Sequence, residues 1–479
     1  MNYESNIGLE VHAQLLTRSK IFCSCSTEFG NEPNSQVCPV CLGFPGTLPA
    51  LNRKAVEFAV KMGLATQCQI ASISTFARKN YFYPDLPKGY QISQYEEPLC
   101  RNGFLEIEFN DELKRIAIQR IHLEEDAGKS IHHEDWVNEN ESLIDLNRCG
   151  VPLIEIVTFP VIESPHEAFI YLTQLRQLLR YLGICDGNME QGRLRCDANV
   201  SIRPRDSQKF GVKTELKNMN SFHGVEKALT FEIERQIRTM KNGGSIQHET
   251  LFWDERKNIA IPIRTKEHES DYRYFPEPDL VPLKINPTLV QELMQEIPEL
   301  PVPRRNRFVS NYAIPKYDAN VLTGERVIAD YFEAVAQQIP DAKLASNWIL
   351  REILNVIKDE QDFVTIPVSG MALAELLNLI LEGRITIKIA KVIFQEMLTK
   401  GKSATEILTE KKLVQISDVA ELKAIVTKVI DNNPAQVRKY QSGQKKLFDY
   451  FMGQVMRETH GKANPLEVKK ILQEKLSTF

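Results

Sequence analysis

The chain has 479 residues, of which 43% are hydrophobic and 25% are charged, and both fractions are typical of a folded globular protein. This length predicts about three domains with full hydrophobic cores, which excludes a small disulfide-stapled scaffold. There are 59 Lys and Arg against 63 Asp and Glu, so the net charge of −4 excludes a global positive field, and any nucleic acid must meet a local basic surface. The sequence has no apolar run of about 18 residues and no targeting pattern near its start, so we expect a cytoplasmic protein without a membrane partner.

The part of the chain up to about Glu292 is rich in turn residues and in strand-like alternation. After Pro301-Val302-Pro303 the spacing of apolar residues becomes that of helices. We therefore predict an α+β fold class, in which a domain built on an antiparallel sheet precedes two all-helical domains. The predicted domains are residues 1–292, 293–405 and 406–479.

The segment Ile7-Gly-Leu-Glu-Val-His12 alternates between apolar and polar side chains, as a strand with one buried face does. Glu10 and His12 point to one face, whereas Leu9 and Val11 point to the other. This strand is therefore expected to bury its apolar face and to present a carboxylate and an imidazole on the opposite one.

Four cysteines follow closely, at Cys23, Cys25, Cys38 and Cys41. Thiols stay reduced in the cytoplasm, and two short chelating pairs on separate turns can close a tetrahedral thiolate site, which zinc prefers. The alternative is a redox pair at Cys38 and Cys41, but such a pair normally opens a helix, and here Gly43-Phe-Pro-Gly46 follows. The spacing therefore predicts structural zinc.

Two acidic sites lie further along the chain. Glu124, Glu125 and Asp126 are consecutive, and Glu155 stands inside the apolar run Pro152–Val157. A carboxylate in such a run must be paired, bound to a metal or shifted in pKa, because burying it alone costs about several kcal/mol. An ordinary buried salt bridge is the alternative reading of Glu155.

Two further strand-like segments, 193–202 and 212–217, repeat the alternation. A face that mixes short carboxylates and amides with Arg and Lys suits an anionic substrate and Mg²⁺, although each strand alone could simply face water. Side chains would have to hold any phosphates, because Gly128-Lys129-Ser130 lacks the first glycine of a phosphate-binding loop. The polar positions of the two segments are Arg193, Arg195, Asp197, Asn199, Ser201, Lys213, Glu215 and Lys217.

The end of the chain predicts a helical hairpin. Leu447, Tyr450, Phe451 and Val455 form one apolar stripe, and Asn464-Pro465-Leu466-Glu467 reads as the capped start of a second helix. In the second helix we expect Val468, Ile471, Leu472 and Leu476 to face inward. Residues 435–479 hold nine Lys or Arg against four Asp or Glu, a local charge of +5 that can meet phosphates or simply be solvated.

The ordered series of motifs resembles the B subunits of aspartyl/glutamyl-tRNA(Asn/Gln) amidotransferases, the GatB/GatE family, over nearly the whole chain. No glycine-flanked nucleophilic serine of the GxSxG type is present, which fits a family whose hydrolytic half lies in another subunit. The motifs that carry the resemblance are Ile7-Gly-Leu-Glu-Val-His12, Cys38-Pro-Val-Cys-Leu-Gly43, Arg78-Lys-Asn-Tyr-Phe-Tyr-Pro-Asp85, Tyr90-Gln-Ile-Ser-Gln94, Leu123-Glu-Glu-Asp-Ala-Gly-Lys129, Pro152-Leu-Ile-Glu-Ile-Val157, Arg195-Cys-Asp-Ala-Asn199 and Glu215-Leu-Lys-Asn-Met-Asn-Ser221.

The resemblance implies a kinase-like cradle domain, a helical domain and a tail similar to the YqeY family. In the family, ATP phosphorylates the side-chain carboxylate of Glu or Asp misacylated on tRNA, and ammonia then displaces the phosphate. Carried over to this sequence, the magnesium set is His12, Glu125 and Glu155, and Glu10, Glu124, Asp197 and Glu215 surround a second cation or the phosphates. Lys79 and Lys88 guide ammonia or hold phosphate, and the nucleotide-binding set is Arg193, Arg195, Asn199, Lys213 and Lys217.

The resemblance also implies partners. An amidase-fold A subunit would supply ammonia through a tunnel, a small C subunit would complete a heterotrimer, and the basic tail would hold the body of the misacylated tRNA. The E subunit of the archaeal glutamate-specific enzyme carries an extra insertion for which 479 residues leave no room. The alternative function is a non-catalytic, zinc-stabilised scaffold that binds tRNA, and the sequence leaves open whether Glu-tRNA(Gln), Asp-tRNA(Asn) or both are used.

Overall fold

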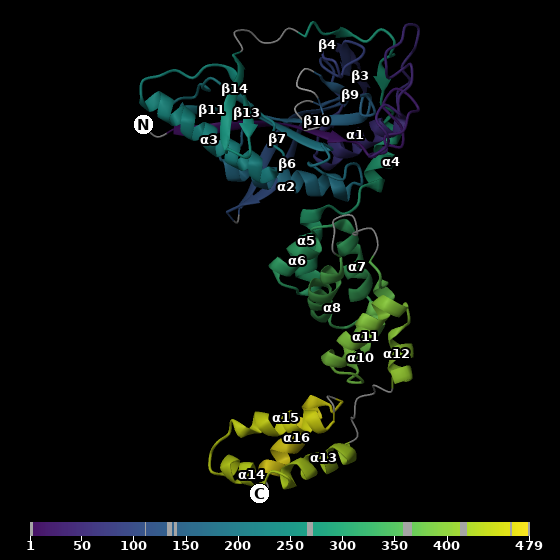
Figure 1. Ribbon diagram of the computed structural model, residues 1–479, viewed down its shortest axis with the longest axis vertical. Coiled ribbons are helices and arrows are strands. Elements are labelled where there is room, and N and C mark those ends of the chain that lie inside the picture. Colours follow the sequence, from purple (N-terminus) through teal and green to yellow (C-terminus); the bar gives the residue numbers. More distant parts are fainter. Residues whose placement is uncertain are drawn as a thin grey trace. The chain divides into compact units, whose positions relative to one another are not determined.

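The computed structural model describes residues 3–110, 112–131, 137, 141–265, 272–357, 366–411, 419–459 and 462–477 (Figure 1). The chain divides into two compact units, Met1–Pro301 and Val302–Phe479. The first unit has one hydrophobic core, and the second has two separate clusters over residues 308–408 and 422–476. Helix α12 (Ala404–Lys411) packs Ile407 and Leu408 into the 308–408 cluster, so that core extends past the predicted limit at 405.

A nine-stranded sheet forms the centre of the first unit. All neighbouring strands are antiparallel except β12 and β13, which are parallel because helix α3 (Phe222–Lys241) crosses over between them. The sheet is therefore mixed, and the prediction of a purely antiparallel sheet was wrong at this one pair. In spatial order the strands are β14 (Ile259–Thr265), β13 (Glu249–Asp254), β12 (Thr214–Lys217), β11 (Leu194–Pro204), β1 (Tyr3–Gln14), β10 (Pro152–Thr158), β7 (Glu112–Glu125), β6 (Cys100–Phe109) and β2 (Gln69–Ile70).

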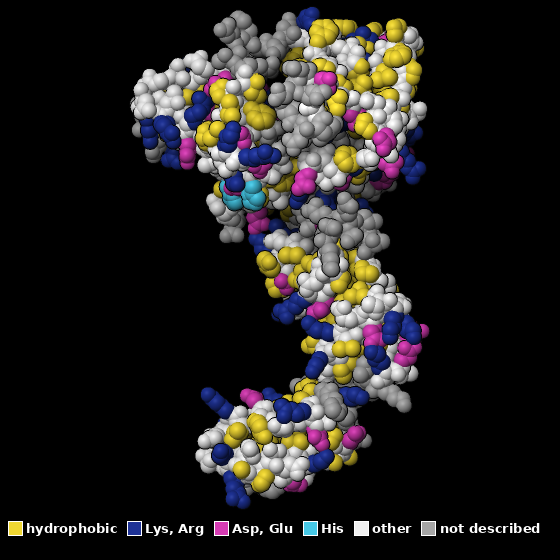
Figure 2. Space-filling view, in the orientation of Figure 1, with side chains coloured by type: hydrophobic (Ala, Val, Ile, Leu, Met, Phe, Trp, Pro, Cys, Tyr) yellow, Lys and Arg dark blue, Asp and Glu magenta, His cyan; other side chains and the backbone are white. Residues whose placement is uncertain are grey.

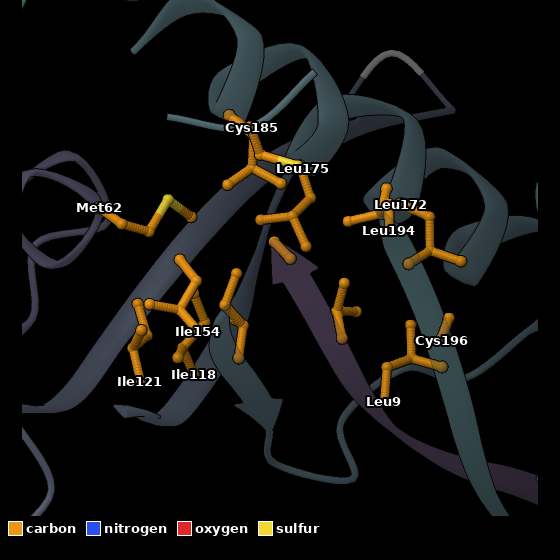
Figure 3. Packing of buried hydrophobic residues seen from close by; sticks show 14 of the residues in the cluster. Leu9, Met62, Ile118, Ile121, Ile154, Leu172, Leu175, Cys185, Leu194 and Cys196 are labelled. Carbon is orange, nitrogen blue, oxygen red and sulfur yellow. The ribbon is translucent and has the colours of Figure 1, made fainter. Parts of the chain in front are cut away.

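One face of the sheet is apolar, and helices cover it. Figure 3 shows Leu172 and Leu175 of α2 (Pro165–Tyr181) against Leu9, Leu194 and other side chains of the strands. Helix α3 packs beside α2, and α1 (Arg53–Ala65) adds Met62 to the same core. Each fully buried Leu or Ile contributes roughly 1.5–3 kcal/mol, so this layer fixes which face of every strand stays polar.

A small three-stranded sheet of β15 (Phe275–Pro276), β4 (Ala77–Asn80) and β5 (Tyr90–Ser93) meets the end of β7. Pairing of β6 with β7 stops at Ile121, which leaves the backbone of the following residues with a free edge. Side chains next to β5 satisfy that edge, since Gln94 Oε1 accepts from Leu123 N at 3.0 Å and Gln91 Nε2 donates to Glu125 O at 2.6 Å. The remaining short strands pair as β3 (Ile73–Ser74) with β16 (Leu283–Lys284) and β8 (Lys129–Ile131) with β9 (Leu143–Asp145).

The second unit is helical, as the sequence predicts. In the tail, Phe451, Val455, Val468 and Leu472 are buried together, which confirms the predicted hairpin, and Asn464 Oδ1 accepts from Glu467 N at 3.4 Å as the predicted cap. Figure 2 shows Lys and Arg spread over the visible face of this cluster with acidic side chains among them. The helices from α4 onward, of which α4 still belongs to the first unit, are α4 (Pro287–Glu296), α5 (Pro301–Tyr312), α6 (Lys316–Leu322), α7 (Arg326–Ala336), α8 (Ala342–Trp348), the π-helical turn Ile349–Ile353, α9 (Leu354–Val356), α10 (Gly370–Leu381), α11 (Ile387–Lys400), α12, α13 (Val419–Asp431), α14 (Pro434–Gln441), α15 (Leu447–Glu458) and α16 (Pro465–Ser477).

None of the helices within the described ranges has both the length and the apolar character that crossing a bilayer requires.

Candidate active site

The strand register gathers polar side chains from five strands on the face of the large sheet that the helices leave free. His12 lies opposite Glu155 of β10 on one side and opposite Arg195 of β11 on the other, and Glu155 lies opposite His122 of β7. Directly opposed residues share a face, so these side chains form one row across the sheet. A parallel row pairs Glu10 with Asp197, and Asn199 pairs with Glu215 of β12.

The tightest group in the row is His12, Glu124 and Glu155. His12 Nε2 lies 3.4 Å from Glu155 Oε2 and 3.6 Å from Glu124 Oε1, and one donor atom of each residue falls within 4.8 Å of the others. Both carboxylates are buried. One imidazole nitrogen and two carboxylate oxygens at this spacing fit a divalent cation.

The electrostatics of the group follow from burial and from its two histidines. Burial alone would raise the pKa of Glu155, but the charge of His122 and hydrogen bonds from His12 and His122 hold that pKa well below its ordinary value. Burial opposes protonation of His122, but the charge of Glu155 outweighs it and raises the pKa of His122 to about 9. The pKa of Glu10 is raised by burial and by the negative charges of Glu155 and Asp197. The acids therefore differ in charge state within one small space, which is typical of sites that do acid–base or metal chemistry.

His122 is a member of this group to which the sequence analysis gave no role. Its Nε2 lies 3.4 Å from Glu155 and 3.8 Å from Glu124, and its buried Nδ1 has no hydrogen-bond partner among the described residues. The signal was present, because His122 stands two residues before Glu124 in a strand and so shares its face.

Glu125 lies elsewhere, in contrast to the predicted set of His12, Glu125 and Glu155. Neighbouring residues of a strand point to opposite sides, so Glu124 rather than Glu125 joins His12 and Glu155. Glu125 instead pairs with the buried Lys88, and its Oε1 accepts from Ile92 N at 2.8 Å.

Lys79, on β4, faces the acidic group. Its Nζ lies 4.9 Å from the ring centre of Tyr272 and 5.9 Å from that of Tyr81. Burial would lower the pKa of Lys79, but the charges of Glu124, Tyr274 and Glu155 raise it, so its ammonium stays charged. The structure thus brings Lys79 to the cluster and places Lys88 beside Glu125.

The cations expected on β11 and β12 are divided between the site and its surroundings. Arg195 donates to the buried Asp126 at 2.7 Å, and Lys217 pairs with Asp197 and with Glu215 at 2.9 Å. Asn199 Nδ2 donates to Glu10 Oε1 at 2.9 Å, which links the two rows.

Two of the predicted residues stand outside the face because they precede their strands. Arg193 comes before β11 and pairs with Asp186 at 2.6 Å, and Lys213 is exposed before β12. The sequence analysis placed both one residue inside a strand. Strand ends follow from hydrogen bonding, which alternation alone does not reveal.

The four cysteines form a second cluster. Their sulfur atoms lie within 4.8 Å of one another, and all four are free thiols. Thiolates from two separate turns at this spacing fit one tetrahedral metal ion. A cavity of about 210 Å³ lies beside the cluster, and its lining includes Cys23, Cys41, Lys88 and Glu125.

Comparison with known proteins decides the family. Residues 5–291 match the family model of the GatB/GatE catalytic domain, and residues 330–476 match that of the GatB domain. Over 473 residues, 98% of this chain and 99% of the relative, it is 52% identical to the aspartyl/glutamyl-tRNA(Asn/Gln) amidotransferase B subunit of Thermodesulfovibrio yellowstonii. The chain belongs to this B-subunit family.

Other B subunits of the family align over the full length as well. That of Chlorobium phaeobacteroides is 52% identical over 477 residues, 99% of this chain and all of the relative, and that of Thermoanaerobacter pseudethanolicus is 51% identical over 478 residues with both chains fully covered. The resemblance drawn from the sequence motifs is therefore confirmed at the level of the family.

Proposed function

We propose that this chain is the B subunit of a tRNA-dependent amidotransferase and that it activates and amidates the side-chain carboxylate of Glu or Asp misacylated on tRNA(Gln) or tRNA(Asn). The observation that carries the proposal is the buried group of His12, Glu124 and Glu155 with Lys79 beside it, in a chain that matches the family's catalytic domain. The enzyme class is a ligase that forms a carbon–nitrogen bond in protein biosynthesis, with the catalytic domain acting as a kinase-like cradle.

The chemistry explains why such a site is needed. A carboxylate is a poor electrophile, so its oxygen first attacks the γ-phosphorus of ATP, and ADP leaves. The nitrogen of ammonia then attacks the acyl carbon of the resulting acyl phosphate, loses a proton and displaces inorganic phosphate. Both steps move negative charge onto phosphate oxygens, and positioned cations stabilise that charge.

His12, Glu124 and Glu155 would hold a divalent cation such as Mg²⁺, which when bound neutralises phosphate oxygens. Lys79 contributes a fixed positive charge at the same place, since its pKa is raised. Glu10, Asp197, Glu215, Arg195, Asn199 and Lys217 form the neighbouring rows and would orient the nucleotide or a second cation. Arg193 and Lys213 lie outside these rows.

Ammonia would come from an amidase-fold A subunit, with a small C subunit completing a heterotrimer in the cytoplasm. The buried pair of Lys88 and Glu125 borders the 210 Å³ cavity and would guide ammonia toward the acyl group. The four cysteines would hold structural zinc, and the YqeY-like tail, with its local charge of +5, would bind the tRNA body.

The test uses the complex reconstituted with its A and C partners, labelled ATP and each misacylated tRNA in turn. Glu155→Gln and His12→Ala should abolish ATP-dependent acyl-phosphate formation and leave tRNA affinity within about twofold, because neither residue lies on the tail. Glu106→Gln, which removes a carboxylate of the surface pair with Arg115, is the matched control and should keep full activity. Unchanged turnover in both site variants would contradict the proposal and favour a non-catalytic tRNA-binding scaffold.

A further inference from the structure

Lys20 is a buried cation without a carboxylate partner. Its side chain is completely inaccessible to solvent, and no acidic group among the described residues lies within ion-pair distance of it. A buried ammonium is costly unless a negative group compensates it. The other buried lysine nearby, Lys88, is already paired with Glu125.

The contacts of Lys20 point to the cysteine cluster as its negative partner. Its Nζ lies 3.7 Å from Cys41 Sγ and 3.4 Å from the carbonyl oxygen of Leu146. Its backbone N–H donates to the carbonyl of Cys25 at 2.9 Å, so the same residue also fixes the turn that carries the first cysteine pair. Neither contact is needed for packing the apolar core.

The backbone beside the cluster leaves room for this side chain. Gly150 adopts a positive φ of 82°, and a Cβ placed there would come within 3.5 Å of both Lys20 Cδ and Cys41 Cβ. The next residue after Lys20, Ile21, donates its N–H to the carbonyl of Gly150 at 2.9 Å. The Lys20 stem is thus held in one position between Cys41 and the strand that follows Gly150.

The charge of the cluster explains what the lysine does. Four thiolates around one divalent cation carry a net charge of about −2 in a partly buried place, and a hydrogen-bonded ammonium offsets half of it. We propose that Lys20 is the internal counter-ion of the four-cysteine metal site and sets its metal affinity. This inference rests on the proposed zinc site and not on the amidation reaction.

The test compares metal binding in Lys20→Met, which keeps the apolar stem and removes the charge, with the unaltered chain. Competition with a chromophoric chelator should show zinc affinity reduced by about 10–100-fold, and the absorption of bound Co²⁺ should shift because Cys41 loses a donor. Lys114→Met is the control, since Lys114 pairs with Glu163 and Glu167 away from the cysteines, and its zinc affinity should be unchanged.

A double variant separates charge from packing. Cys25→His lowers the negative charge of the cluster by one, so it should cost much less zinc affinity in the Lys20→Met background than in the unaltered chain. If Lys20→Met alone cannot be recovered folded, the double variant should be recoverable. Additive losses, equal zinc affinity in Lys20→Met, or failure of both variants to fold would overturn the role of Lys20, whereas absence of zinc and Co²⁺ binding in the unaltered chain would overturn the metal site itself.

Discussion

The two candidate metal clusters of this chain are built in opposite ways. The four cysteines come from one short stretch, and two local chelating pairs suffice to bring them together. His12, Glu124 and Glu155 come from β1, β7 and β10, which are far apart in sequence and meet only through the register of the sheet. A local cluster can be deduced from spacing, whereas a cluster across strands depends on which face each residue takes.

The sharpest way to break this comparison is to exchange the two adjacent acids. Glu124→Gln should lower acyl-phosphate formation by about 10²–10³-fold and weaken binding of Mn²⁺ as a probe, because Glu124 joins His12 and Glu155. Glu125→Gln should leave Mn²⁺ affinity within about threefold, because Glu125 pairs with Lys88. A greater loss of Mn²⁺ affinity in Glu125→Gln would show that the register assigned to the end of β7 is wrong.

The same acids reveal the limits of sequence reasoning. The alternation of Glu10 and His12 with Leu9 and Val11 was enough to predict the polar face of β1 and the core beneath it. Choosing between Glu124 and Glu125 required knowing which of them shares a face with His122, and that depends on where β7 keeps its pairing with β10. Physically, alternation gives the faces of a strand but neither its ends nor its partners.

The remaining differences have the same origin. The parallel pairing of β12 with β13 arises from the crossover of α3, and no local pattern reports it. Asp126, which anchors Arg195 and Gln14 from a buried position, has a role that appears only when β1, β7 and β11 lie side by side. By contrast, the tail hairpin was predicted in detail because its helices are defined by local apolar spacing and a local cap.

The pH dependence of stability should distinguish the sheet cluster from the rest of the fold. The folded-state pKa of His122 is raised from 6.5 to about 9. Because the raised value belongs to the folded state, the stabilisation is fully present below about pH 6.5 and is lost as the pH rises toward 9. Urea unfolding without added divalent cations should show the chain losing about 3 kcal/mol over this range relative to His122→Gln. Parallel pH profiles for the two proteins would contradict the assigned charge of His122.

Removing the tail should affect tRNA binding more than chemistry. A chain that ends at Lys411 lacks the whole 422–476 cluster, so no part of that core is left unpaired. In the reconstituted complex the KM for misacylated tRNA should rise about 10-fold or more, with kcat at saturating tRNA changed less than about threefold. The salt dependence of KM should also become shallower, and identical kinetics at every salt concentration would exclude a role for the tail.

The smallest expected effect links the two clusters. A Cβ added at Gly43 in the cysteine loop would lie 2.4 Å from Lys88 Cγ, whereas one at Gly46 would meet nothing within 4 Å. Both glycines have a positive φ, so both alanine variants carry about 1 kcal/mol of backbone strain. Gly43→Ala should also displace Lys88 and lower glutamine-dependent amidation about 10-fold, and Gly46→Ala should not. Equal activities would show that the cysteine loop does not position Lys88.

The most direct test of the activating role of the His12, Glu124 and Glu155 cluster follows one oxygen atom. Misacylated tRNA carrying ¹⁸O in its side-chain carboxylate is given to the reconstituted complex with ATP and glutamine, and the inorganic phosphate is analysed by mass spectrometry. Transfer through an acyl phosphate predicts one ¹⁸O atom in the released phosphate for the unaltered chain and none above background for Glu155→Gln. Amidated tRNA accompanied by unlabelled phosphate would contradict the account.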